Sequence, residues 1–285
     1  MCRLFGMLGN VRSHGEPWLI DSDHSLLKQS NGSPEQVQSD GWGIAWVSTG
    51  EAVHVEKGSL GAFQPGEVEH FRSAAERSHG PLVIAHLRKA SNPMGLPKER
   101  LLALENSQPF AYRHQIFAHN GSILYPRETR PFLGPYESKL QGVNDSEVLF
   151  YLFLRHLDQV REPVAAFSRS IGDLFRVWQE KGSPRGGPYS GLNVLFSRSP
   201  EELWAFCLYR GEHGHGLLDP SHPYYEMTYR TDARQMIVGS ERFDSKHDDW
   251  RALPNGQFLH AWAEQGIVGA KIGTIPMPPE LRALA

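Results

Sequence analysis

Short apolar runs rich in strand-forming residues recur from one end of this chain to the other, and they constrain its fold more than any other feature. Runs of this length and composition, bounded by turn-forming residues, are typical of β-strands. Enough of them are present to form two sheets. We expect strands at residues 2–8, 43–47, 82–87, 115–119, 192–196, 203–209, 236–238 and 258–262.

Residues 163–181 carry the clearest helical pattern, and Pro163 is acceptable in the first turn of a helix. One stripe contains Phe167, Ile171, Leu174, Phe175 and Trp178. This stripe is expected to pack on a sheet.

A second helix is predicted at "NDSEVLFYLFLRHL", residues 144–157, with Asn144 or Asp145 as the N-cap and Glu147 in the first turn. Apolar residues nearly encircle it, so it should be well buried. Because strands and helices do not alternate regularly, the pattern indicates an α+β fold with two mostly antiparallel sheets covered by helices.

Length, charge and cysteine content narrow the class of protein. The chain has 285 residues, of which 40% are hydrophobic, and we expect one domain over residues 2–285. A net charge of −3 offers no electrostatic footprint for nucleic acid or an anionic membrane. Two cysteines, at 2 and 207, suit a reducing cytoplasm, and no apolar stretch resembles a secretory signal or a membrane span.

Cys2 stands directly behind the initiator Met, and two interpretations of it remain open. It could be a small buried side chain in the first strand, as free cysteines often are. Alternatively, removal of Met1 would place a thiol and a free α-amine on one residue. That amine titrates near ~7.7–8.0 and could act as the base for its own thiol.

Arg88 follows the predicted strand at 82–87, where the chain leaves the sheet. A guanidinium at such a position can hold a carboxylate through two parallel hydrogen bonds, and Ser91 could supplement it. An ordinary surface arginine is the alternative. His86, within the strand, is expected to be a core histidine.

Asn120-Gly121 is the strongest short signal for a β-hairpin turn. The same pair offers an amide and a backbone N–H that could converge on one point, which is what an oxyanion hole requires. Asp145 is similarly ambiguous, because it could cap its helix or pair with a substrate ammonium group.

In "SDGWGIAW", residues 39–46, glycines flank Trp42 where a strand begins. Gly43 would permit close approach of a ligand, although an ordinary turn explains the glycines equally well. "GEHGHG" at 211–216 lacks cysteines or carboxylates at ligand-like spacing, so we predict no metal site.

The order of these motifs is more specific than any one of them. N-terminal Cys, DGWG, Arg at a strand end, ENSQPF, HNG and NDSE together resemble the glutaminase domain of class II glutamine amidotransferases, which are N-terminal-nucleophile hydrolases, and in particular its stand-alone branch. The resemblance spans residues 2–147 sharply and continues less sharply through "IVGSERFD" at 237–244. Residues after 147 are expected to complete the domain.

The resemblance implies a four-layer αββα sandwich and roles for individual residues. Cys2 would attack the side-chain amide of glutamine, and Asn120 and Gly121 would stabilise the oxyanion. Arg88, with Ser91 near it, would bind the α-carboxylate and Asp145 the α-ammonium. Trp42 and Gly43 would belong to the substrate loop, where Gln38-Ser39 replace the Arg-Gly of fused members. No cofactor is implied.

Several functions remain compatible with this sequence. The chain shows no second motif set for an ammonia acceptor, so it would hydrolyse glutamine, cleave another γ-glutamyl amide, or supply ammonia to a separate synthase. A non-catalytic module that binds an amino acid or a partner would be expected to lack at least one key residue. All five are present, namely Cys2, Arg88, Asn120, Gly121 and Asp145. Redox sensing would need a resolving cysteine, whereas Cys207 lies in the apolar run "LWAFCLY".

Overall fold

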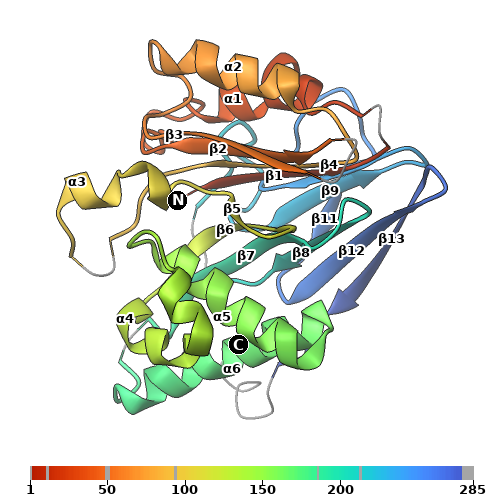
Figure 1. Cartoon of the computed structure of the whole chain (residues 1–285). Coiled ribbons are helices and arrows are strands. Elements are labelled where there is room, and N and C mark those ends of the chain that lie inside the picture. The colour runs from red at the N-terminus through yellow and green to blue at the C-terminus, as the bar shows by residue number, and fades with distance from the viewer. Residues whose placement is uncertain are drawn as a thin grey trace.

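The computed structural model describes residues 2–10, 13–48, 52–92, 95–184, 186–211 and 214–277. These residues form two stacked sheets with helices on both outer faces, so that four layers follow one another from top to bottom in Figure 1. All the strand pairings within the two sheets are antiparallel. The predicted α+β class and the four-layer sandwich are confirmed.

The first sheet has seven strands in the order β11-β9-β10-β1-β4-β2-β3. Their bounds are β1 Arg3–Leu8, β2 Trp42–Val47, β3 Val53–Gly58, β4 Leu82–Leu87, β9 Met227–Thr231, β10 Met236–Gly239 and β11 Arg251–Leu253. The second sheet has six strands in the order β13-β12-β8-β7-β6-β5. Their bounds are β5 Phe110–Tyr112, β6 Gln115–Ile123, β7 Tyr189–Ser197, β8 Glu202–Cys207, β12 Gln257–Glu264 and β13 Ile267–Thr274.

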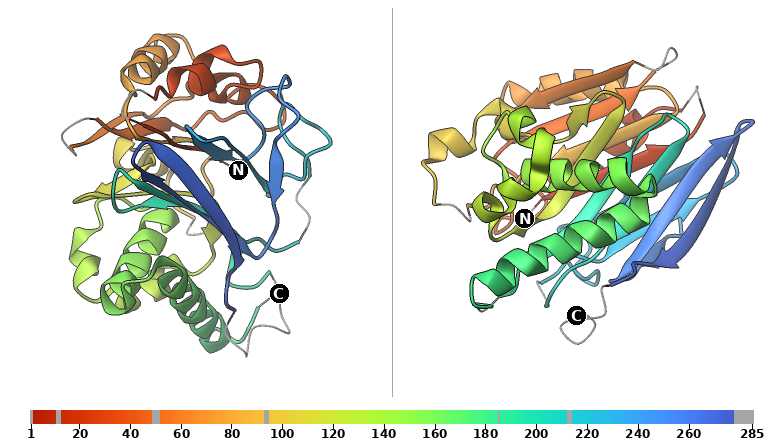
Figure 2. Two further views of the ribbon diagram at one scale, coloured as in Figure 1. Left: turned by 90° about the vertical axis from the view of Figure 1, so that its right-hand side faces the viewer. Right: turned by 60° about the horizontal axis from the view of Figure 1, so that its bottom comes forward.

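Helices cover the outer faces of the two sheets (Figures 1 and 2). The first sheet is covered by η1 Pro17–Asp21, which is a π-helical turn, α1 Leu26–Gln29 and α2 Glu67–Arg77. The second sheet is covered by α5 Asp145–Val160 and α6 Pro163–Glu180, which lie in front of it in the right-hand view of Figure 2. The shorter elements are α3 Lys98–Leu101, η2 Leu104–Asn106, α4 Pro126–Thr129 and η3 Arg130–Lys139.

The strand β1 shows why the central runs are continuously apolar. Successive side chains of a strand point to opposite faces, and both faces of this sheet are covered. Leu4 and Leu8 therefore pack between the two sheets, whereas Phe5 and Met7 pack against the helix layer. All six residues of β1 are buried.

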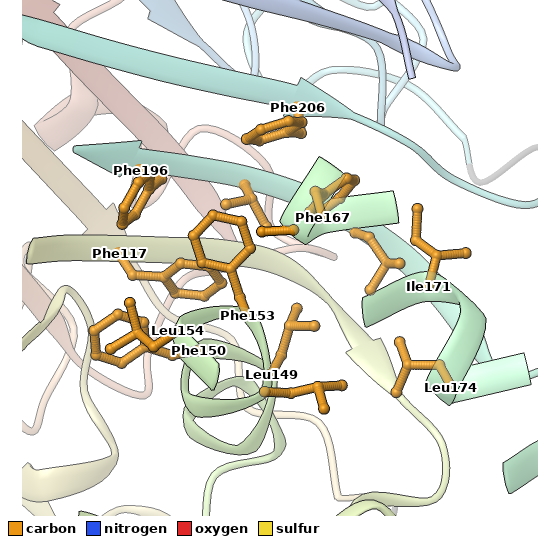
Figure 3. Close-up of a cluster of buried hydrophobic side chains, with 14 of the residues drawn as sticks. Phe117, Leu149, Phe150, Phe153, Leu154, Phe167, Ile171, Leu174, Phe196 and Phe206 are labelled. Atoms are coloured by element: carbon orange, nitrogen blue, oxygen red, sulfur yellow. The ribbon is translucent and has the colours of Figure 1, made fainter. Parts of the chain in front are cut away.

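Helices α5 and α6 pack on the second sheet through an aromatic cluster, shown in Figure 3. Phe153 of α5 contacts Phe196 of β7 edge-on, at 4.7 Å between ring centroids, and Phe167 of α6 stacks on Phe206 of β8 at 4.3 Å. Burying each such ring contributes roughly 1.5–3 kcal/mol to folding. Both predicted helices are confirmed, and the predicted stripe of α6 faces this cluster.

Strands β3, β5, β9, β11 and β13 were not predicted from the sequence. Four of them, β3, β5, β11 and β13, are edge strands, so each has a neighbouring strand on one side alone. The alternation of β13, for example, leaves most of its side chains partly or fully exposed. Without a dense apolar run, such strands carry a weak sequence signal.

The predicted hairpin turn at Asn120-Gly121 is wrong. Both residues lie inside β6, which pairs with β7 through this point and has a bulge between Gly121 and Ile123. At φ +146°, a Cβ on Gly121 would lie 2.0 Å from the carbonyl oxygen of Gly191. Glycine is required here because two backbones approach closely, and not because the chain reverses.

Candidate active site

The beginning of β1 and the end of β4 lie at the same end of the first sheet, because the two strands are antiparallel neighbours and Arg3 pairs with Leu87. Cys2 and Arg88 flank that pair. Cys2 reaches the second sheet through its backbone nitrogen, which donates a hydrogen bond to Oδ1 of Asn120 at 3.1 Å. The fold therefore brings together residues that are 118 positions apart in sequence.

Cys2 is 8% exposed, and its thiol lies 3.6 Å from the carbonyl oxygen of Lys89. Burial raises the pKa of the Cys2 thiol above its ordinary value, and this effect outweighs the nearby Arg88 guanidinium, which favours the thiolate. The protonated thiol is therefore the resting form at neutral pH. A base is needed before the sulfur can act as a nucleophile.

The Asn120 side chain is fully buried, and one of its two polar atoms has a hydrogen-bond partner among the described residues. Its Oδ1 accepts from Cys2, whereas its Nδ2 has no hydrogen-bond partner among the described residues. A buried donor without a partner costs roughly 1–3 kcal/mol, so it is rarely retained without a reason. This donor lies next to Cys2, where an oxyanion formed by attack of the sulfur could accept from it.

Arg88 is 3% exposed and is held by the backbone on two sides. Its Nη1 donates to the carbonyl oxygens of Leu101 at 2.8 Å and of Asp40 at 3.2 Å. Within the described part of the chain, nothing accepts from its Nε or Nη2. The guanidinium is thus oriented by the protein and keeps donors for a further anion.

Asp145 does not cap α5, because Asn144 does so by accepting from the backbone N–H of Ser146 at 2.9 Å. The carboxylate of Asp145 instead accepts from the backbone N–H of Ile123 at 2.9 Å and is 5% exposed. Burial raises the pKa of Asp145 to about 6. A cation placed beside this carboxylate would lower that pKa and stabilise the charged form.

The other predicted site residues lie as follows. The Ser91 hydroxyl accepts a hydrogen bond from Ser122, near the bulge of β6, at 2.8 Å. The Trp42 ring is buried on the helix-facing side of the first sheet, where its N–H donates to Glu67. A Cβ on Gly43 would lie 2.3 Å from the carbonyl oxygen of Gln108, so this glycine permits close approach of the segment that precedes β5.

The "ENSQPF" motif supports the site, and the sequence alone does not reveal how. The Gln108 side chain bonds both the N–H and the C=O of His119, at 2.7 and 3.1 Å, which fixes β6 beside Asn120. Asn106 accepts from the backbone N–H of Val143 and its carbonyl accepts from Asn144, which fixes the start of α5. The motif thus connects the HNG motif in β6 with the NDSE motif at the start of α5.

His119 lies on the opposite side of β6 from Asn120, toward α5. Its Nε2 donates to the carbonyl oxygen of Gly191 at 3.0 Å, since a carbonyl can only accept, and its Nδ1 therefore accepts from Ser146. Burial lowers the pKa of His119 to about 4. This neutral histidine links β6 to β7 and to α5.

Sequence reasoning missed Arg3 and Glu241, which are fully buried behind Cys2. The Arg3 guanidinium stacks on the ring of Tyr224 at 3.9 Å, and its Nε lies 3.9 Å from Glu241. Glu241 accepts from three backbone N–H groups at 217–219, and the preceding Ser240 accepts from the N–H of Leu4. A charged residue inside an apolar strand was the available signal.

The sequence model of the family described as glutamine amidotransferases class-II matches residues 1–271. The chain belongs to this family. Among curated proteins, it is 28% identical over 173 residues to the probable glutamine amidotransferase DUG3 of Saccharomyces cerevisiae. That alignment covers 56% of this chain and 46% of the yeast protein, so the chain spans less than half of the relative's length.

Two solved structures share the fold. A glutamine aminotransferase class-II domain protein from Silicibacter pomeroyi matches with a TM-score of 0.64, over 97% of this chain and 100% of that one. The glutamine phosphoribosylpyrophosphate amidotransferase of B. subtilis matches with a TM-score of 0.61, over 97% of this chain and 50% of that one. Both are 20% identical to this chain.

The family resemblance drawn from the sequence motifs is therefore confirmed, and so is the N-terminal-nucleophile hydrolase fold. Within the described ranges, none of the helices combines the length and apolar character that crossing a bilayer requires.

Proposed function

We propose that this protein is an amidohydrolase that cleaves the side-chain amide of glutamine, or another γ-glutamyl amide, with Cys2 as the nucleophile. One observation carries the proposal. The backbone nitrogen of Cys2 is held by Asn120 Oδ1, and the Nδ2 of that same side chain is a buried donor with no described partner. One asparagine would thus position the base and stabilise the oxyanion.

Removal of Met1 would convert the backbone nitrogen of Cys2 into a primary amine that is still within reach of Asn120 Oδ1. An α-amine titrates near ~7.7–8.0, so part of the population is unprotonated at neutral pH. A hydrogen bond from this amine to Asn120 would direct its lone pair toward another partner, and the thiol is on the same residue. The raised pKa of the thiol makes this base necessary.

The reaction would proceed in two stages. The amine accepts the proton of Sγ as the sulfur attacks the amide carbon, and the former carbonyl oxygen becomes an oxyanion bound by Asn120 Nδ2 and the N–H of Gly121. Collapse of this intermediate breaks the C–N bond, and the protonated amine returns its proton to the leaving ammonia or amine. Water then attacks the γ-glutamyl thioester, which releases glutamate and regenerates the thiol.

An amino-acid head group carries one negative and one positive charge, and the site offers one partner for each. Arg88, with its remaining donors, would bind the α-carboxylate, and Ser91 lies on the same segment. Asp145 would bind the α-ammonium. Ammonia could pass to a separate synthase partner, and the free thiols of Cys2 and Cys207 are compatible with a reducing cytoplasm.

The test begins with the intact mass of the purified protein, which should show loss of Met1. Glutamate release from glutamine and from a panel of γ-glutamyl amides is then measured for wild type and for Cys2→Ala. Cys207→Ala is the matched control, since it removes the other buried thiol from a core strand. Added hydroxylamine should intercept the thioester and yield γ-glutamyl hydroxamate.

We expect activity to disappear in Cys2→Ala and to persist in Cys207→Ala. Equal activity in Cys2→Ala and wild type would refute the nucleophile, and uniform retention of Met1 in an active protein would refute the base. Saturable binding of glutamine without turnover of any γ-glutamyl amide would instead identify a non-catalytic binding module.

A further inference from the structure

A cavity of about 200 Å³ lies beside the candidate active site, and three arginines line it. Its walls come from α3 and the segment that leads into it, from α4 and η3, and from the start of α5. In Figure 1, α3 and α4 lie on the same side of the molecule as the N-terminus. The proposed function assigns this cavity no role.

The charge in this cavity is strongly positive. The side chains of Arg100 and Arg127 have no ion-pair or hydrogen-bond partner among the described residues, and none of the residues that line the cavity is acidic. Arg130 lies 3.3 Å from Glu137, but both side chains are about half exposed, and such pairs contribute little. These exposed guanidiniums share one small space, so a bound anion would lower the repulsion between them.

The size and lining of the cavity limit the ligand. Its volume lies below the roughly 300–1,000 Å³ of sites for drug-sized molecules, so the ligand must be small. Guanidinium groups match carboxylate and phosphate oxygens with paired hydrogen bonds. Leu96, Leu140 and Val148 add apolar surface that would contact a short carbon skeleton.

The cavity shares its supports with the candidate active site. Asn144 lines the cavity and immediately precedes Asp145. Leu96 is fixed by two hydrogen bonds to the Asn92 side chain, at 2.7 and 2.9 Å. Arg100 lines the cavity, and the next residue in the chain, Leu101, accepts from Arg88. The same two segments therefore form one wall of each site.

We infer that this cavity is a binding site for a small organic anion that bears a phosphate group or a pair of carboxylates. Two or more negative charges are needed to match three guanidiniums, and a single carboxylate would leave them under-compensated. The inference concerns a site distinct from the one that holds Cys2. It is measured by binding and not by turnover, so its failure would leave the proposed function intact.

Isothermal titration at low ionic strength provides the test, with inorganic phosphate and succinate as separate probes. The full-length wild type is compared with Arg100→Ala and Arg127→Ala, both of which change exposed side chains. Arg72→Ala, on the exposed face of α2, is the matched control because it removes the same charge outside the cavity. Thermal melting verifies that each variant is folded.

We expect one saturable site for at least one probe, weakened roughly tenfold or more by either cavity substitution and unchanged in Arg72→Ala. Binding should also weaken as salt is added. Saturation by phosphate alone would identify a phosphorylated ligand, and saturation by succinate alone a dicarboxylate. The inference is overturned if neither probe saturates a site, or if Arg72→Ala weakens binding as much as the cavity variants do.

Discussion

Replacement of Asn120 by alanine should separate catalysis from stability. If Nδ2 binds the oxyanion, its loss lowers kcat by roughly 10²–10³, which corresponds to about 2.7–4 kcal/mol of transition-state stabilisation. Folding should change much less. The substitution leaves the backbone N–H of Cys2 without its acceptor, at a cost of about 1–3 kcal/mol, but it also removes a buried unpaired donor of similar cost.

Asn193 offers a matched control, because it lies directly opposite Asn120 on β7 and is also fully buried. Both ends of its side chain are hydrogen-bonded, to the carbonyl of Tyr225 at 2.6 Å and the N–H of Leu208 at 3.0 Å. Asn193→Ala should therefore lower the free energy of unfolding by roughly 2 kcal/mol or more while the folded protein keeps most of its kcat.

The assay is steady-state release of glutamate beside urea unfolding of the same samples. Asn120→Asp adds a third point, since it keeps an oxygen for Cys2 but cannot donate to an oxyanion at neutral pH, and we expect its kcat to fall at least as far as that of the alanine variant. The reasoning is refuted if Asn120→Ala keeps its kcat, or if its loss of activity merely follows a loss of folded protein.

Three further predictions concern other parts of the site. Asp145→Asn should raise KM for glutamine roughly tenfold or more. In wild type, KM should also rise as the pH falls below about 6, because the Asp145 carboxylate then takes up a proton. A pH profile of the Asn variant should lack that rise. Gly121→Ala should lower the free energy of unfolding by more than roughly 1–3 kcal/mol, because the new Cβ would meet backbone. Gly182→Ala, at a φ of +79° with open space, should cost only about 1 kcal/mol. Equal costs in thermal melts of the two variants would contradict this prediction. Glu241→Ala should destabilise by roughly 3–5 kcal/mol, because it leaves three backbone N–H groups without an acceptor and the buried Arg3 guanidinium without its nearby carboxylate. Arg3→Met should cost less, and urea unfolding that gave the reverse order would contradict this pairing.

Much of the fold could be predicted because its signals are local. The continuous apolar run of β1 and the amphipathic stripe of α6 each reflect the surface that covers them, and both were located within one residue at each end. The N-cap of α5 was likewise confined to two adjacent positions. In contrast, α2 was missed because its sequence, EVEHFRSAAER, buries only three residues against the sheet.

The residue types of the candidate site were predicted from the sequence, whereas the conformation and orientation of some of these residues were not. Asn120-Gly121 predicted a turn, since that pair usually makes one, but the structure places it within β6. Trp42 stood in a glycine-flanked motif typical of a ligand loop, yet its ring points toward α2. Neither outcome could be read from neighbours in sequence, because each depends on which backbone or helix packs against that face.

The sequence by itself determined the class of the fold and the order in which an N-terminal thiol, a strand-end arginine, an amide and a carboxylate at a helix start follow one another. Periodicity and residue chemistry are sufficient for this, since each acts over a few residues. Only the tertiary structure decided that the Asn120 Nδ2 is left without a described partner, that Asp145 turns away from its helix cap, and that Arg3, next to Cys2, is fully enclosed. These features depend on contacts between residues 22 to 238 positions apart, which no local pattern specifies.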